Sequence, residues 1–145
     1  MKVRHILGIS GGKDSAALAI YLKQKYPNLK IEYYNSDTGC ELAETELLID
    51  RLSAYLGKIK RLRAAEDSPE PTPFEHFLKA TGGFLPSPQA RWCTKKMKLD
   101  EFERYVGDDM QCLMLAFVVM KTVMAMYLPS QISSLYFLLG EISGV

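Results

Sequence analysis

The first 63 residues alternate between short apolar runs and longer amphipathic segments, a pattern that predicts alternating strands and helices. The predicted strands are Lys2–Ile9, Lys30–Asn35 and Lys58–Arg63, each short and rich in apolar or aromatic residues. Between them, apolar positions recur at helical spacing in Ser15–Lys25 and Glu41–Leu56. Because strands and helices alternate, we expect a parallel sheet joined by right-handed crossovers.

Both predicted helices end at recognisable signals. Pro27 follows the first helix and cannot continue it, and Gly57 follows the second as its expected C-cap. On the second helix, the side chains expected to point inward are Leu47, Leu48, Leu52, Tyr55 and Leu56. The expected fold class is therefore α/β, with a Rossmann-like parallel sheet and helices on both of its faces.

Beyond residue 63 the pattern is less regular. Residues 66–73 form a proline-rich acidic segment that predicts a loop, and a short helix is expected at Phe74–Lys79. A second proline-containing loop reaches Gln89, and Lys98–Tyr105 is predicted to be helical. The chain is long enough for one domain and too short for two ordinary ones.

Composition changes abruptly near residue 109. Of the 35 charged residues (18 Lys and Arg, 17 Asp and Glu), 33 lie in positions 1–109, whereas residues 110–145 contain only Lys121 and Glu141. The apolar stretch 112–128 is shorter than the ~20 residues that span a bilayer, and a central lysine costs roughly 2.5–3.5 kcal/mol on insertion. A membrane segment, a buried terminal hairpin and translation in a shifted reading frame are the alternatives for this tail.

We favour the shifted frame. Back-translating residues 120–137 and regrouping the codons one frame over permits a segment with ordinary charge and turn content. On this hypothesis residues 1–109 form the domain, which is incomplete at its C-terminus. Residues 110–145 are then an atypical apolar tail that carries no functional information. Sequencing the gene around codons 108–115 tests the hypothesis.

Charge and cysteine content narrow the class of protein. The net charge of +1 does not by itself indicate a nucleic-acid partner, so that partner is left open. The three cysteines, Cys40, Cys93 and Cys112, form no CxxC pair, which argues against a disulfide framework and against a zinc site. The start of the chain lacks the pattern of a secretory signal, and we expect a reducing cytoplasm. His5 and His76 are expected to have structural roles.

The most informative segment is Gly8–Ser15, which reads Gly-Ile-Ser-Gly-Gly-Lys-Asp-Ser and follows the first predicted strand. Its paired glycines let backbone N–H groups approach an anion closely, and the helix behind it points its positive end at the loop. The alternative is a polar turn with Ser10 as the N-cap. Because ligands of open α/β sheets bind at this edge, the phosphate site is favoured. The predicted ligand-binding residues are Ser10, Gly11, Gly12, Lys13, Asp14 and Ser15.

This segment is not a Walker A loop, because the required spacing between glycine and lysine is absent. It resembles the PP-loop of the ATP pyrophosphatase and adenine nucleotide α-hydrolase superfamily, whose fingerprint is Ser-Gly-Gly-x-Asp-Ser. The resemblance implies an adenine nucleotide as ligand, either ATP or a relative of phosphoadenylyl sulfate (PAPS).

A second string, Asn35–Thr45, follows the second predicted strand. Thr38 and Glu41 have the spacing of a capping box, which is its structural interpretation. The string also resembles the Asp-Thr-Gly-x-x-x-x-Glu-Thr segment of the PAPS reductase-like branch of the superfamily. By that resemblance Glu44 and Thr45 open the helix behind the nucleotide. The residues that would border the nucleotide are Asp37, Thr38 and Gly39.

A third string, Pro86–Lys98, contains Arg-Trp-Cys-Thr-x-x-x-Lys and again resembles the PAPS reductase-like branch, where this region faces the phosphate or sulfo end of the ligand. Arg91 can hold an oxyanion through two parallel hydrogen bonds, and Lys95 can act as a point charge. Neighbouring cations favour the nucleophilic thiolate of Cys93. The alternatives are a buried, inert cysteine and a solvated, charged helix face.

Together these resemblances imply an enzyme that cleaves ATP between its α- and β-phosphates and transfers AMP, in sulfur activation or sulfur insertion. Its cofactors would be ATP and Mg²⁺, with Asp37 as an alternative ligand of the metal ion. The catalytic residues would be Lys13, Arg91, Cys93 and Lys95. Sulfate or a sulfur acceptor is the expected second substrate, and no membrane partner is expected.

Two other functions stay open. One is a sulfonucleotide reductase, although the catalytic cysteine that such enzymes usually carry in a C-terminal segment is absent here. The other is a truncated, non-catalytic remnant that still binds nucleotide.

Overall fold

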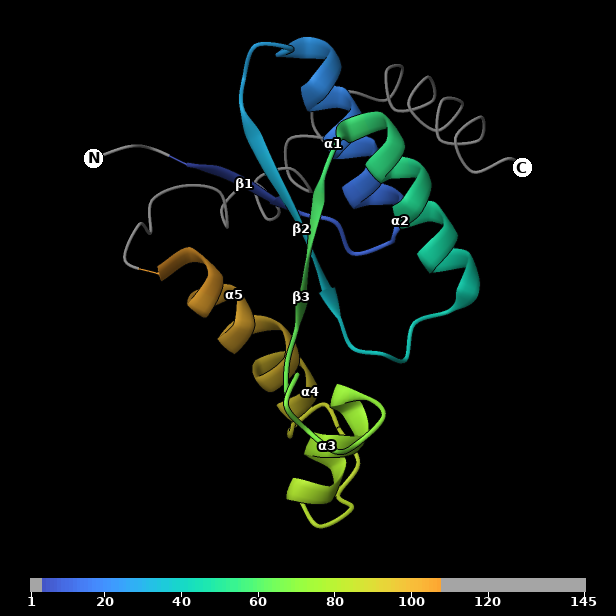
Figure 1. Ribbon diagram of the computed structural model, residues 1–145, viewed down its shortest axis with the longest axis vertical. Coiled ribbons are helices and arrows are strands. Elements are labelled where there is room, and N and C mark those ends of the chain that lie inside the picture. The colour runs from blue at the N-terminus through green and yellow to red at the C-terminus, as the bar shows by residue number, and fades with distance from the viewer. Residues whose placement is uncertain (1–3, 108–145) are drawn as a thin grey trace. The chain divides into compact units, whose positions relative to one another are not determined.

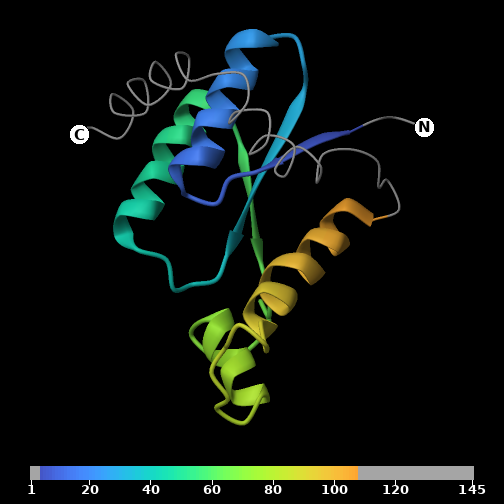
Figure 2. The same ribbon diagram turned by 180° about the vertical axis from the view of Figure 1, so that it is seen from behind.

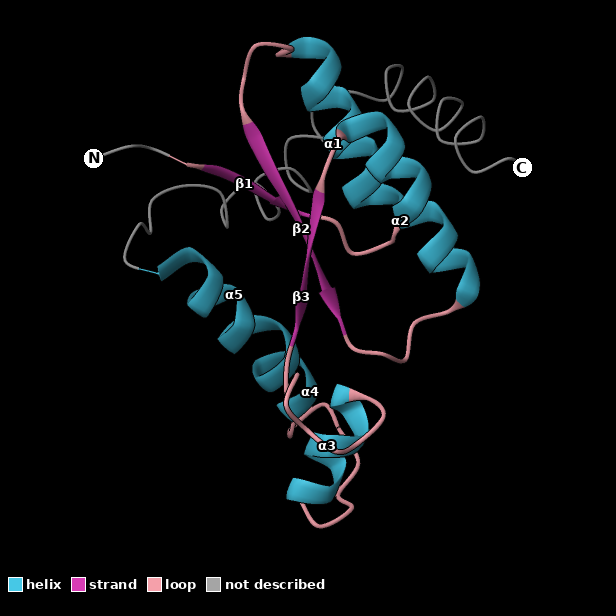
Figure 3. Ribbon diagram, in the orientation of Figure 1, coloured by secondary structure: helices cyan, strands magenta, loops and turns pink. Residues whose placement is uncertain are grey.

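The computed structural model describes residues 4–107, and its secondary structure follows the predicted order (Figures 1 and 3). The elements are β1 (His5–Gly8), α1 (Lys13–Lys25), β2 (Ile31–Asp37), α2 (Ala43–Leu56), β3 (Ile59–Arg63), α3 (Pro73–Ala80), α4 (Trp92–Thr94), the π-helical turn η1 (Lys95–Leu99) and α5 (Asp100–Val106). The tail 110–145, with its proposed shifted frame, lies outside the described residues. Within residues 4–107, no helix is long and apolar enough to cross a membrane.

The three strands form a parallel sheet in the order β1-β2-β3, which confirms the predicted α/β, Rossmann-like class. The register pairs His5 with Ile31 and Gly8 with Tyr34, so β1 and β2 start together at one edge of the sheet. Right-handed crossovers between neighbouring strands place α1 and α2 on the same face. The two helices lie side by side in both views (Figures 1 and 2).

The described chain divides into two compact units. The first contains residues 4–35 and 43–60, and the second contains residues 36–42 and 61–107. In the first unit, α1 is buried without interruption from Ser15 to Ile20, because small alanine side chains let it pack closely against its neighbours. Each unit is described separately below.

The buried stripe of α2 differs from the predicted one. It consists of Ile49, Leu52 and Leu56, which recur at spacings of three and four residues and therefore share one helical face. Leu47 is 55% exposed and Tyr55 is 38% exposed, so the prediction that both point inward was wrong. Ile49 takes their place because it lies on the same stripe as Leu52 and Leu56.

In the second unit, α3 begins where predicted. Thr72 caps it, accepting a hydrogen bond from the backbone N–H of Glu75 at 3.1 Å, and Pro73 occupies the first turn. The indole N–H of Trp92 donates to the carbonyl of Phe84 at 3.0 Å, and its ring lies 5.4 Å from that of Phe74. The helical segment predicted at Lys98–Tyr105 begins earlier, at Trp92, and continues through α4 and η1 into α5.

Candidate functional site

The loop between β1 and α1 is held by two serine hydroxyls in the first unit. The backbone N–H of Ser10 donates to Oγ of Ser15 at 3.2 Å, and that hydroxyl donates to the carbonyl of Gly12 at 3.1 Å. The two hydroxyl oxygens lie 3.1 Å apart, and Gly12 N–H donates to Oγ of Ser10 at 3.4 Å. Ser15 is only 3% exposed. These hydroxyls therefore fix the loop from within, because they accept hydrogen bonds from the backbone N–H groups of Ser10 and Gly12.

Helix α1 begins two residues earlier than the sequence pattern predicted. Its N-cap is Gly12, not Ser10, and no side chain caps it. The backbone N–H of Ala16 donates to the carbonyl of Gly12 at 3.3 Å, which places Lys13 and Asp14 in the first helical turn. N–H groups of a first turn point out of the helix end, where they and the helix dipole favour an anion. The geometry thus suits a phosphate group at Lys13–Ser15.

Gly11 has no room for a side chain. Its φ of +80° lies in the left-handed region that favours glycine, and a Cβ atom there would overlap the Cγ2 methyl of Thr45. Thr45 is in the first turn of α2, as the resemblance implied for Glu44 and Thr45. The start of the second helix therefore supports the phosphate-binding loop from behind.

Asn35 holds the base of the loop, a role that the sequence did not reveal. Its Nδ2 donates to the carbonyl of Ile9 at 2.6 Å, while the N–H of Ile9 donates to the carbonyl of Tyr34 at 2.7 Å. Asn35 is 3% exposed, and its Oδ1 has no hydrogen-bond partner among the described residues. The sequence signal that could have indicated this role is an amide side chain at a strand position expected to be buried, since buried polar groups need hydrogen-bond partners.

In the second unit, the carboxylate of Asp37 forms ion pairs with arginine side chains. Its Oδ2 accepts from Nη1 of Arg63 at 3.1 Å, and its Oδ1 accepts from the N–H of Gly39 at 2.9 Å and lies 3.8 Å from Nη2 of Arg61. Arg63 also donates to the carbonyl of Pro71 at 3.2 Å. No group of three metal-ligating side chains occurs within residues 4–107. These contacts do not fit Asp37 as a ligand of Mg²⁺.

Thr38 and Gly39 have structural partners of their own. Thr38 Oγ1 donates to Glu41 Oε1 at 2.9 Å, but α2 begins only at Ala43. The predicted capping box was therefore wrong, because its glutamate lies outside the helix. Gly39 has a φ of +73°, and a Cβ there would lie 3.0 Å from Cβ of Thr72. Contact of Asp37, Thr38 and Gly39 with a nucleotide remains a prediction.

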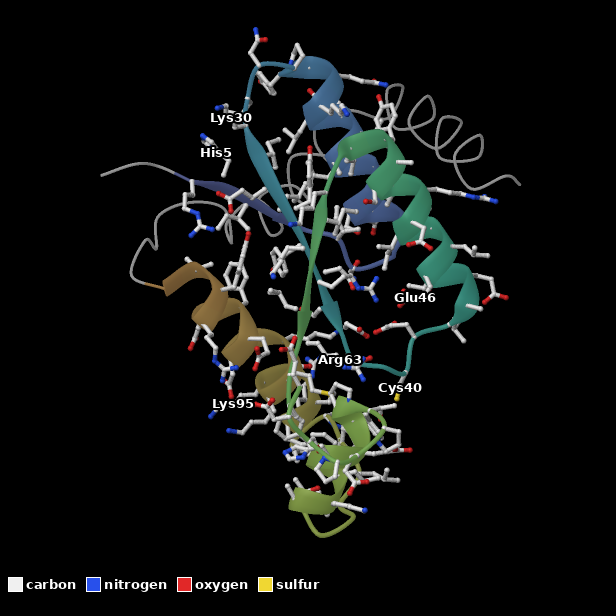
Figure 4. The ribbon with its side chains drawn as sticks, viewed as in Figure 1. His5, Lys30, Cys40, Glu46, Arg63 and Lys95 are labelled. Carbon is white, nitrogen blue, oxygen red and sulfur yellow. The ribbon has the colours of Figure 1, made fainter. Side chains whose placement is uncertain are left out.

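The cationic segment of the second unit starts at α4. Arg91 is its N-cap, and the N–H of Lys95 donates to the carbonyl of Arg91 at 3.2 Å, so the two exposed cations lie one helical turn apart (Figure 4 labels Lys95). Cys93 lies between them as a free, half-buried thiol, with Sγ 3.9 Å from Oγ1 of Thr94. Arg91 and Lys95 therefore share one side of this helical turn, whereas Cys93, two residues from each, lies on another side. Their catalytic roles remain a prediction.

Comparison with known proteins gives distant relatives. The chain is 29% identical over 120 residues to the tRNA-specific 2-thiouridylase MnmA of Actinobacillus succinogenes and 30% identical over 116 residues to that of Haemophilus ducreyi. It is also 30% identical over 114 residues to an uncharacterized protein of Methanocaldococcus jannaschii. These alignments cover 75%, 72% and 78% of the chain.

The chain spans less than a third of these relatives, namely 30%, 29% and 22% of their lengths. No family model matches the chain, and no solved structure matches it. The similarity to the thiouridylases supports the PP-loop ATP pyrophosphatase superfamily, and it does not support the PAPS reductase-like branch.

Proposed function

We propose that this chain is the nucleotide-binding part of an ATP-dependent enzyme that adenylates an acceptor during sulfur insertion. The proposal is carried by the serine-braced turn before α1, a 13-residue helix. The first-turn N–H groups at Lys13–Ser15 would bind a phosphate at the end of this helix. ATP-using relatives of the PP-loop superfamily support the same assignment.

The loop would hold the β- and γ-phosphates of ATP. Its N–H groups and the Lys13 ammonium would neutralise these phosphates and leave the α-phosphorus open to attack. An oxygen of the acceptor then forms a bond to the α-phosphorus, the bond between that phosphorus and the bridging β-oxygen breaks, and pyrophosphate leaves with the electron pair. Mg²⁺ would arrive on the phosphates as part of the substrate, since the Asp37 carboxylate is already paired with arginine.

The second unit carries its own predicted catalytic residues. Arg91 and Lys95 would bind oxyanions. Cys93 would receive a sulfur atom from an external persulfide donor, which leaves as a thiol, and so become a persulfide. Its outer sulfur would displace AMP from the activated acceptor, and an external thiol would then reduce the resulting disulfide and release the thiolated acceptor. A reducing cytoplasm would keep this cysteine free, as required.

We propose a tRNA as the acceptor. The support is the tRNA specificity of the thiouridylases to which three quarters of the chain is similar. A PAPS-like sulfonucleotide is the second candidate ligand, and the Arg91–Lys98 segment is the observation that favours it.

Exchange of labelled pyrophosphate into ATP tests the proposal. With bulk tRNA present, the protein should catalyse the exchange, and Lys13→Ala should reduce it by about a hundredfold, the scale expected when one preorganised charge is removed. Lys79→Ala, which removes an exposed lysine from α3, is the matched control and should retain activity.

Other outcomes point elsewhere. PAPS binding without exchange would favour sulfonucleotide reduction over adenylation. A chain that unfolds without cooperativity and binds neither ligand would indicate a non-catalytic remnant.

A further inference from the structure

Charged residues of the first unit are segregated between its two ends. In a parallel sheet all strands start at one edge, and the helices that connect them end at that same edge. Five lysines occupy the ends of α1 and α2 and the starts of β2 and β3. They are Lys23, Lys25, Lys30, Lys58 and Lys60. Figure 4 shows Lys30 beside His5 at this end, whereas Glu46 lies toward the opposite end of α2.

The carboxylates of this unit lie mainly away from these lysines. Asp14, Glu44 and Glu46 are in the first turns of α1 and α2, at the phosphate-loop end. At the lysine end, Glu32 is engaged by Arg4, whose Nη2 lies 2.6 Å from Oε2. The lysines therefore form a locally cationic edge, although the net charge of the whole chain is only +1.

Tyrosine rings are interleaved with the lysines at this edge. Lys25 Nζ donates to the hydroxyl of Tyr21 at 2.7 Å and lies 5.8 Å from the ring centre of Tyr26. Lys23 Nζ lies 4.8 Å from the ring centre of Tyr55 and donates to the backbone carbonyl of that residue. Tyr26 is 47% exposed and Tyr55 is 38% exposed, so both present ring surface to solvent.

The charge of this edge persists at neutral pH. The hydrogen bond to Tyr21 raises the pKa of Lys25 above its ordinary value, which keeps that ammonium group protonated. Lys25, Lys30, Lys58 and Lys60 are all exposed. The helix C-termini offset part of this charge, but their effect falls off within the last turn.

We propose that this lysine–tyrosine edge binds single-stranded nucleic acid, with phosphates on the lysines and a base stacked on Tyr26. A cationic surface that carries exposed aromatic rings matches what single strands require, since the backbone is polyanionic and every base has a face that stacks. A membrane surface would demand large apolar side chains at this edge, and among residues 4–107 the exposed aliphatic side chain there is Leu29, at 39%. The proposal rests on this surface and not on the nucleotide chemistry proposed above.

Fluorescence anisotropy with single-stranded RNA and DNA of about 12 nucleotides tests the proposal on the full chain without ATP. Binding should weaken with salt. The triple variant K25Q/K30Q/K58Q should reduce the magnitude of the slope of log K against log salt by about 2, since each lost phosphate contact removes about 0.7. The matched control K79Q/K96Q/K98Q removes the same charge from exposed lysines of the second unit and should keep the slope.

Two variants of Tyr26 test the proposed stacking of a base on its ring. Tyr26→Ala should weaken binding about fivefold or more, whereas Tyr26→Phe, which keeps the ring, should bind like the parent. Tighter binding of RNA than of DNA would identify RNA as the natural ligand of this edge.

Three outcomes would overturn the proposal. They are no binding at low salt, equal weakening by both triple variants, and binding to phosphatidylserine vesicles in place of either oligonucleotide. Because ATP is absent from the measurement, loss of pyrophosphate exchange in Lys13→Ala does not bear on the result.

Discussion

The Cα of Gly11 faces the Cγ2 methyl of Thr45 so closely that no Cβ fits between the phosphate-binding loop and the start of α2. Any side chain at residue 11 therefore destabilises the folded state in two ways. One is the positive φ of +80°, which costs an alanine roughly 1–2 kcal/mol. The other is the overlap with Thr45, for which overpacked sites lose typically 1–3 kcal/mol.

Gly11→Ala should lower the free energy of unfolding by about 2 kcal/mol or more. Thr45→Ser removes the offending methyl and should restore about 1 kcal/mol of that loss in the double variant, leaving the φ cost in place. Urea denaturation of the parent, both single variants and the double variant measures the coupling. Strictly additive effects would show that the two residues do not touch.

Asn35 connects β2 to the base of the loop through the carbonyl of Ile9. Asn35→Ala leaves that carbonyl without its donor and should lower the free energy of unfolding by about 1–3 kcal/mol. Asn28→Ala, at an exposed turn before β2, is the control and should change stability by about 0.5 kcal/mol or less. Equal effects in the two variants would refute the structural role of Asn35.

Asp37→Asn keeps an oxygen for the N–H of Gly39 but removes the charge that pairs with Arg63. The pair is partly exposed, so the loss of stability should be about 1 kcal/mol or less. Because the carboxylate is committed to arginine, the Mg²⁺ concentration for half-maximal pyrophosphate exchange should not rise. A marked rise in that concentration would restore Asp37 as a metal ligand.

Tyr34 should make stability depend on pH at the alkaline end. Burial raises its pKa above the ordinary 10.0 in the folded protein, whereas the unfolded chain has the ordinary value. Below pH 10 both forms are protonated and the stabilising contribution is complete; it is lost as pH rises through the folded pKa, because the unfolded chain releases its proton first. Urea denaturation between pH 9 and 11 should show a shallower decline for Tyr34→Phe than for the parent, with Tyr26→Phe as control. Identical declines for the parent and Tyr34→Phe would contradict the assignment.

Much of the first unit could be predicted from local pattern. The strand before Gly8, the helix after it and the second helix ending at Gly57 were all found from periodicity, glycine and proline. The glycine-rich turn before α1 was found for the same reason, since it is a local arrangement of consecutive residues. Its binding of phosphate stays a prediction.

The sequence by itself determined which segments are helix or strand, because hydrophobic period and glycine placement act within a few residues. Anion binding at Gly8–Ser15 stays a prediction. Tertiary structure alone decided which partners the polar groups take. Asp37 meets Arg63 across 26 residues, and Asn35 reaches Ile9 across the same separation. It also decided that five scattered lysines share one edge, since only the parallel sheet brings strand starts and helix ends together. Such pairings depend on which elements become neighbours, which local periodicity does not encode.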